Sequence, residues 1–141
     1  MEKAPRLVEI CAEHKERNGP LLPILHAVQA EFGCIDEDAV RAIAQELNLS
    51  RAEVHGVVSF YHDFDHAPDD RPVVQICRAE ACRARGVEVL MDDAKATAGR
   101  RVRLETVYCL GLCSVGPNAR VGDAMHSRLD SAGLKKVINS V

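Results

Sequence analysis

The side chains best suited to chemistry in this chain are four cysteines in its second half. They stand as Cys77-x4-Cys82 and, after a further 26 residues, as Cys109-x3-Cys113. Each pair lies at the end of a segment with strand-like sequence, and neighbouring strands that end together would bring the two pairs to one place. Four thiolates around one place can hold either a tetrahedral zinc ion or an iron–sulfur cluster.

The spacing within each pair favours the cluster over zinc. Structural zinc sites are typical of Cys-x2-Cys turns, which aim both sulfurs at one ion. A 2Fe–2S rhomb takes two sulfurs on each of two irons, and intervals of four and three residues suit that wider reach. From spacing alone, zinc and a thiol–disulfide pair remain open, although the Cys-x-x-Cys typical of thioredoxin-type enzymes is absent.

The residues around the first pair suit an anionic centre. Arg78, Arg83 and Arg85 stand near it, against the single Glu80. After the second pair, Gly116 would let backbone amides approach sulfur without a Cβ in the way. Cations and N–H donors are the groups that tune the potential of an iron–sulfur cluster. A solvated helix start and an ordinary turn would account for the same residues.

The sequence of residues 1–62 predicts a bundle of four short helices. Apolar residues recur there at helical spacing in four runs. Asp36 can cap the third helix, and Ser50 with Glu53 forms a capping box before the fourth. The polar stretch at 63–71 breaks the periodicity and predicts a linker.

Residues 72–141 predict an α/β domain that would carry the cysteines. The expected order is strand, helix, three strands and helix, at 73–76, 84–98, 101–108, 119–121, 124–129 and from about 131. That order resembles the core of a thioredoxin-like α/β sandwich. The expected fold class is therefore α+β, with an N-terminal helical bundle followed by a thioredoxin-like domain that holds an iron–sulfur cluster.

The cysteine segments resemble those of one known family. Cys-Arg-Ala-Glu-Ala-Cys at 77–82, Tyr-Cys-Leu-Gly-Leu-Cys at 108–113 and Gly116-Pro117 are similar to the thioredoxin-like 2Fe–2S ferredoxins. That family includes NuoE-type subunits of NADH:quinone oxidoreductase, gamma subunits of NAD-dependent formate dehydrogenase and small subunits of bidirectional hydrogenases. The resemblance covers about residues 21–129, and the first cysteine segment is most similar to the formate dehydrogenase gamma subunit.

The resemblance implies that Cys77, Cys82, Cys109 and Cys113 bind one 2Fe–2S cluster. It implies an electron-transfer subunit that has no catalytic residue and exchanges single electrons with a partner subunit that binds a flavin and NAD. FMN and NAD are expected on that partner. The complex implied first is a cytosolic formate dehydrogenase, with respiratory NADH:quinone oxidoreductase or a bidirectional hydrogenase as alternatives. The isolated chain could also form a homodimer.

Hydropathy and charge weigh against other classes of protein. No apolar run approaches the ~20 residues of a membrane-spanning helix, and the start lacks a secretory apolar region, so a cytoplasmic chain without membrane insertion is expected. Residues 39–61 have the pattern of a helix-turn-helix, with two predicted helices joined by a tight turn. However, residues 1–66 carry 6 Lys and Arg against 12 Asp and Glu. Since a recognition helix should be basic, a DNA-binding regulator with a cluster or zinc sensor is the weaker alternative, and no nucleic-acid partner is expected.

The remaining thiols and the histidines predict packing or surface positions. Cys11 lies on the first apolar stripe and is expected to be a core thiol. Cys34 follows Gly33 at a helix end, where packing is favoured over an exposed, oxidisable position. The six histidines show no mutual spacing typical of metal ligands.

Overall fold

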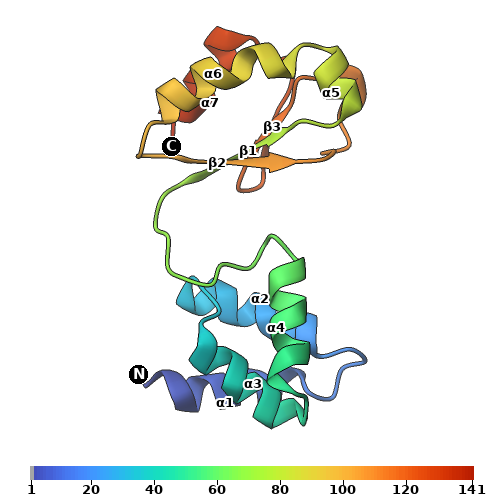
Figure 1. The fold of residues 1–141 in the computed structure, drawn as a ribbon, viewed down its shortest axis with the longest axis vertical. Coiled ribbons are helices and arrows are strands. Elements are labelled where there is room, and N and C mark those ends of the chain that lie inside the picture. Colours follow the sequence, from blue (N-terminus) through green and yellow to red (C-terminus); the bar gives the residue numbers. More distant parts are fainter. Residues whose placement is uncertain (1) are drawn as a thin grey trace. The chain divides into compact units, whose positions relative to one another are not determined.

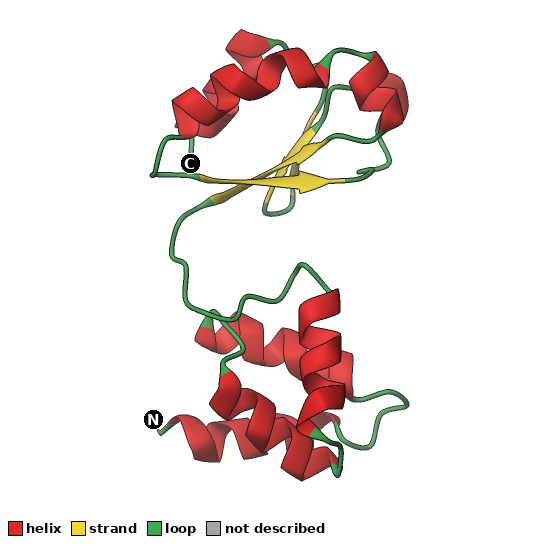
Figure 2. Ribbon diagram, viewed as in Figure 1, coloured by secondary structure: helices red, strands yellow, loops and turns green. Residues whose placement is uncertain are grey.

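The computed structural model describes residues 2–141, which form two compact units. The first unit ends at Asp70, and the second runs from Arg71 to Val141. The first is helical, whereas the second combines a sheet with helices (Figure 1, Figure 2). This confirms the expected α+β class. Within residues 2–141, no helix is both long enough and apolar enough to cross a membrane.

In its described residues, 2–70, the first unit holds four helices, and the sequence provides side-chain caps for the third and fourth. They are α1 (Lys3–His14), α2 (Leu21–Phe32), α3 (Glu37–Leu47) and α4 (Arg51–Phe60). The Asp36 carboxylate accepts the Ala39 N–H at 3.0 Å and so caps α3. At α4, the Ser50 hydroxyl accepts the Glu53 N–H, and the Glu53 carboxylate accepts the Ser50 N–H. The capping box predicted from the sequence is thereby confirmed.

The segment after α4 packs on the helical core. Phe64 is only 5% exposed and belongs to that core. The Ile35 N–H donates to the Asp65 carbonyl at 2.7 Å. The Gln29 amide also accepts the Asp65 N–H at 3.0 Å. The beginning of the segment expected as a linker therefore contributes to the first unit, because a single aromatic residue in a polar stretch has no periodicity to predict its burial.

The second unit is a small mixed sheet with helices. Its elements are β1 (Val73–Cys77), α5 (Glu80–Ala84), α6 (Val87–Ala98), β2 (Arg103–Val107), the 3-10 turn η1 (Cys113–Val115), β3 (Ala119–Val121), β4 (Ala124–His126) and α7 (Ser131–Asn139). The strand order is β2-β1-β3-β4. The pair β1–β2 is parallel, and the pairs β1–β3 and β3–β4 are antiparallel. Helices α6 and α7 lie together on one face of the sheet (Figure 1).

Two elements of the second unit differ from the expectation. The helix expected over 84–98 is α6 and begins only at Val87, because Gly86 has a left-handed φ of +93° and separates it from α5, which was not expected. The strand expected over 124–129 ends at His126. The next backbone N–H groups leave the ladder, since those of Arg128 and Leu129 donate to carbonyls of the preceding loop.

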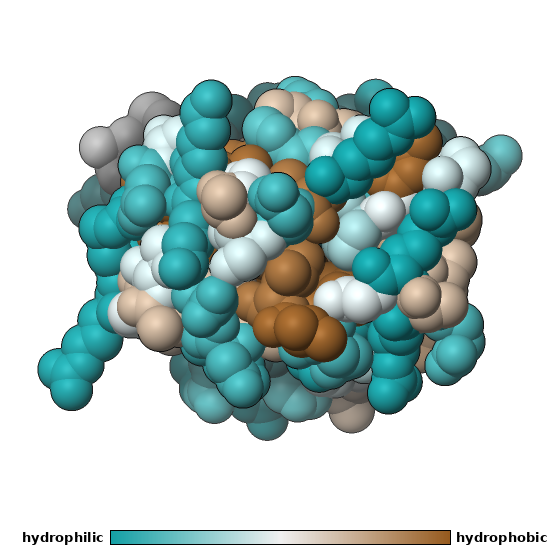
Figure 3. Space-filling model, turned by 90° about the horizontal axis from the view of Figure 1, so that it is seen from above, coloured by the Kyte–Doolittle hydropathy of each residue, from teal (hydrophilic) through white to brown (hydrophobic). Residues whose placement is uncertain are grey.

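Several large apolar side chains of the second unit face solvent. Val89 on α6 is 83% exposed, and Tyr108, just after β2, is 77% exposed. The face drawn in Figure 3 likewise shows an apolar strip among polar side chains. Of these exposed residues, Tyr108 stands next to the second cysteine pair in the chain.

Candidate metal centre

The carboxyl ends of β1 and β2 bring the two cysteine segments together. Cys77 is the last residue of β1 and pairs with Val107, the last residue of β2. The chain after Val107 forms the loop that carries Cys109 and Cys113. Because parallel strands end at the same edge of a sheet, this loop lies beside Cys77. The Cys109 N–H donates to the Cys77 sulfur at 3.3 Å.

The sulfurs of the four cysteines lie in pairs. The Sγ atoms of Cys109 and Cys113 are 3.6 Å apart. The thiols of Cys77 and Cys82 lie close enough for each to shift the pKa of the other. Two thiolates bound to one tetrahedral metal at about 2.3 Å lie roughly 3.8 Å apart, so the spacing of Cys109 and Cys113 suits one metal. Among residues 2–141, no three metal-binding side chains cluster tightly enough to hold a single ion.

The centre has a buried side and an open side. Cys77 and Cys82 are each 1% exposed, whereas Cys109 and Cys113 are exposed. Cys82 stands on the short helix α5, which the sequence pattern did not predict. Buried sulfurs on one side and exposed sulfurs on the other would leave a bound group reachable from one direction.

Backbone N–H groups converge on the Cys77 sulfur. Burial raises the pKa of the Cys77 thiol, but the N–H groups of Ala79, Cys109 and Leu110, together with the Cys82 thiol, lower it by more. The pKa of Cys77 therefore lies below its ordinary value. Cys109 itself has a φ of +93°, which is left-handed and uncommon for a residue with a side chain. Oriented N–H groups of this kind favour an anionic sulfur.

Two of the four thiols, Cys82 and Cys113, have a pKa above the ordinary value. Burial, and then the neighbouring Cys77 thiol, raises the pKa of Cys82. A hydrogen bond with the Cys109 thiol raises the pKa of Cys113. Cys82 and Cys113 must release their protons when a metal binds, because the ligand is the thiolate.

Gly116 and Asn118, which follow the second pair in the chain, pack against Cys82. A Cβ on Gly116 would lie 3.0 Å from the Cys82 sulfur and 3.2 Å from Cδ of Arg85. The Asn118 amide nitrogen lies 3.5 Å from the same sulfur and donates to the Leu112 carbonyl at 2.8 Å. No sequence pattern pointed to Asn118, because an Asn after Gly-Pro is typical of a turn.

The arginines near the first pair are partly neutralised. Arg78 donates to both carboxylate oxygens of Glu88 at 2.9 and 2.6 Å and holds the pKa of Glu88 below its usual range. Arg83 lies 3.8 Å from both Glu80 and Glu88. In the part of the chain that the structure describes, no carboxylate pairs with Arg85. The sequence expectation counted only Glu80, because Glu88 stands on the following helix.

The other two thiols, Cys11 and Cys34, lie in the first unit, whereas the four paired cysteines lie in the second. Cys11 is 0% exposed and Cys34 is 3% exposed. Burial raises the pKa of Cys11 to about 11, which keeps this thiol protonated and inert. The packing positions predicted for both residues are confirmed.

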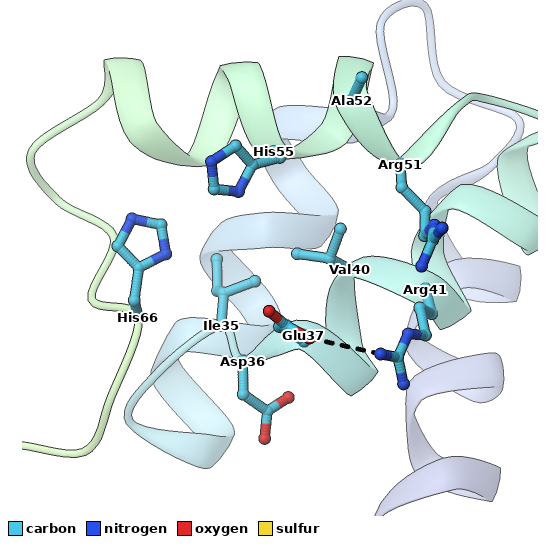
Figure 4. A pocket seen from close by; sticks show the side chains of 9 residues that line it. All are labelled: Ile35, Asp36, Glu37, Val40, Arg41, Arg51, Ala52, His55 and His66. Atoms are coloured by element: carbon cyan, nitrogen blue, oxygen red, sulfur yellow. Dashed lines mark hydrogen bonds and ion pairs between the residues drawn. The ribbon is translucent and has the colours of Figure 1, made fainter.

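A separate hollow lies in the first unit between α3, α4 and the segment around His66 (Figure 4). Its volume is about 630 Å³, and its rim carries the ion pair of Glu37 with Arg41. His55 and His66 face each other across it, with ring centroids 5.8 Å apart. Sequence spacing did not predict this contact, because His66 lies in the expected linker. No cysteine lines this hollow.

Comparison with known proteins points to the same chemistry. Residues 7–141 match the family described as thioredoxin-like 2Fe-2S ferredoxin. An E-type subunit of the NADH-quinone oxidoreductase of Rhizobium meliloti (strain 1021) is 31% identical over 138 residues, which cover 92% of this chain and 82% of that protein. The HndA subunit of the NADP-reducing hydrogenase of Solidesulfovibrio fructosivorans is 25% identical over 141 residues, which cover 94% and 82%.

A solved structure shares the fold. In an NAD+-reducing NiFe-hydrogenase in the air-oxidised state, one chain aligns with 85% of this chain at a TM-score of 0.67 and 26% identity. The present chain spans only 22% of the length of that hydrogenase chain.

Proposed function

The chain belongs to the thioredoxin-like 2Fe-2S ferredoxin family, and from this premise we propose that Cys77, Cys82, Cys109 and Cys113 bind one 2Fe–2S cluster. The observation that carries the proposal is the meeting of two thiol pairs at the carboxyl ends of β1 and β2. Paired sulfurs from two loops are the donor set that a two-iron rhomb needs. The N–H groups around Cys77 support anionic ligands there.

The chain acts in this proposal as an electron-transfer subunit. When bound, the cluster supplies one-electron oxidation and reduction. The four thiolates hold it, and the N–H donors stabilise the negative charge on their sulfurs. Cys77 and Cys82 close the buried side, whereas Cys109 and Cys113 leave the other side accessible beside the exposed Tyr108. The partner therefore exchanges electrons at the side of the second pair.

The partner in this proposal is a subunit that binds FMN and NAD. Such a partner is supported by the relatives, which are named as subunits of an NADH-quinone oxidoreductase and of an NADP-reducing hydrogenase. In this role the chain supplies no general acid or base of its own. It is inactive alone toward formate or NAD.

The complex proposed first is a cytoplasmic NAD-dependent formate dehydrogenase. The Cys-Arg-Ala-Glu-Ala-Cys segment at 77–82 supports it, through its resemblance to the gamma subunit of that enzyme. The names of the relatives favour a second candidate, an NADH:quinone oxidoreductase or a hydrogenase. Affinity purification of the tagged chain from its source cells distinguishes them: formate-dependent NAD reduction by the isolated complex is expected. Co-purification with NADH:quinone activity would favour the second candidate, and no flavoprotein at all would overturn both.

The ligand assignment has a direct test in three serine variants. After anaerobic reconstitution, Cys77→Ser and Cys113→Ser should lose most of the visible absorption of the cluster. Cys11→Ser should keep it, because Cys11 lies in the core of the other unit. A full wild-type spectrum in either of the first two variants would show that the assignment is wrong.

A further inference from the structure

One polar side chain ties the two cysteine segments together from inside the protein. Asn118 is 1% exposed, and it is the one buried polar residue in the described part of the chain, 2–141. Its backbone carbonyl accepts the Cys77 N–H at 3.0 Å. Its side chain reaches both Cys82 on α5 and the Leu112 carbonyl, next to Cys113. One residue therefore contacts the β1 end, α5 and the loop of the second pair.

The orientation of the Asn118 amide follows from its neighbours. A carbonyl oxygen can only accept, so the group 2.8 Å from the Leu112 carbonyl must be the amide nitrogen and not the oxygen. That nitrogen carries two hydrogens. The first is used by Leu112, and the second is available to the Cys82 sulfur at 3.5 Å. Both donors of the amide are thereby directed at the cysteine segments.

The other half of the same amide has no partner. The Asn118 Oδ1 is buried and accepts no hydrogen bond within the region described, residues 2–141. A buried acceptor without a partner costs free energy, and an apolar residue of similar size would avoid that cost. Packing therefore does not explain an Asn at this position. Its two N–H donors, one on the Leu112 carbonyl and one on the Cys82 sulfur, do.

We propose that Asn118 is a positioning residue for the cluster: its N–H group donates to the Cys82 sulfur and raises the reduction potential. This inference rests on the ligand set proposed above. One-electron reduction adds one negative charge, part of which is shared by the thiolate sulfurs. A hydrogen bond to Cys82 stabilises that charge more than it stabilises the oxidised state. Removing the donor makes reduction harder.

The test compares the potentials of variants that lack or weaken the donor. Asn118→Leu replaces the amide by an apolar side chain of similar volume, and Asn118→Ser keeps one hydroxyl donor on a shorter side chain. Each full-length protein is reconstituted anaerobically and titrated with the EPR signal of the reduced cluster as the readout. The potential of the Leu variant is expected to shift downward, with the Ser variant shifted less. Circular dichroism checks that both variants fold.

Ile138→Val is the matched control for lost packing. Ile138 is fully buried in the same unit, and its carbonyl accepts from Arg101, which precedes β2, at the edge of the sheet away from the cysteines. This variant should lower stability and leave the potential unchanged.

Each outcome separates the inference from the proposed function. A wild-type chain that takes up no iron or sulfide overturns the proposed function itself. A wild-type chain that loads normally, with variants of unchanged potential, overturns only the role of Asn118. That role is also overturned if both folded variants fail to load the cluster, because Asn118 would then serve assembly alone. A downward shift shared by Ile138→Val would contradict it as well.

Discussion

At Gly116, a single methyl group would press on the Cys82 sulfur. The Cβ of an alanine there would lie 3.0 Å from Sγ and 3.6 Å from Cα of Cys82, closer to the sulfur than ordinary contact allows. Gly116→Ala should therefore displace Cys82, cost about 1–3 kcal/mol through overpacking and lower the iron and sulfide content after reconstitution. Metal analysis and thermal unfolding measure both effects. Unchanged iron content would mean that the Cys82 sulfur does not need this position.

The residues of the centre differ in how far the sequence could predict them. The four cysteines stand out because two close pairs of thiols are rare outside metal sites and redox sites. Asn118 and Glu88 do not stand out, because each acts through a contact across the fold and has a common sequence context. Glu88 reaches Arg78 from the first turn of α6. Such supporting contacts depend on tertiary structure, which local patterns do not encode.

At the scale of elements, Asp36 is the cap of α3 and also the ion-pair partner of Lys3. The hydrogen bond from Lys3, together with the cap bond from Ala39, holds the pKa of Asp36 below its usual value, against the opposing effect of burial. Asp36→Ala should cost about 1 kcal/mol at neutral pH. Asp36→Asn should cost less, because Asn also caps helices.

The pH dependence of this cap has a definite sign. Because the folded state lowers the pKa of Asp36, its contribution is present above the unfolded pKa and is lost as the pH falls through the folded value. The difference in unfolding free energy between wild type and Asp36→Ala should therefore shrink in acid. Urea unfolding followed by circular dichroism at several pH values measures it. A difference that stays constant into acid would contradict the role of the ionised carboxylate.

Helix α4 offers a stabilising change. Gly56 lies in the helix interior, and a Cβ there would meet no atom within 4 Å. Gly56→Ala should raise the unfolding free energy by roughly 0.5–1 kcal/mol, because Gly loses more backbone conformational entropy than Ala when the helix forms. The cluster content should stay at the wild-type value, so the variant is also a control for Gly116→Ala. A loss of stability would mean that α4 does not have the open surface described.

The elements were predicted best where caps and periodicity agree. Helices α3 and α4 have both, whereas α1 and α2 have the periodicity without a side-chain cap. The capping box before α4 predicted where that helix begins. The short helix α5 was missed, because a helix of five residues is too short to show a period in the sequence. Strand β4 was predicted too long, since the loop carbonyls that capture Arg128 and Leu129 are distant in sequence.

At the scale of the whole molecule, the proposed centre belongs to one unit only. All four cysteines lie within Arg71–Val141, and the first unit has its own core, which includes Phe64. Loading the cluster should therefore slow hydrogen exchange in the second unit, including the N–H groups of Cys109 and Gly111, which donate to sulfur. Amides of α1–α4 should be unaffected. Protection that rises equally in both units would contradict this division.

The central claim is that four thiolates hold one 2Fe–2S cluster that carries single electrons. The most direct test of this claim measures the iron and acid-labile sulfide content of the anaerobically reconstituted chain. Dithionite then reduces the sample, and the EPR signal is integrated. The account predicts two irons and two sulfides per chain and about one unpaired spin after reduction. A chain that retains zinc, or that takes up neither iron nor sulfide, would contradict it.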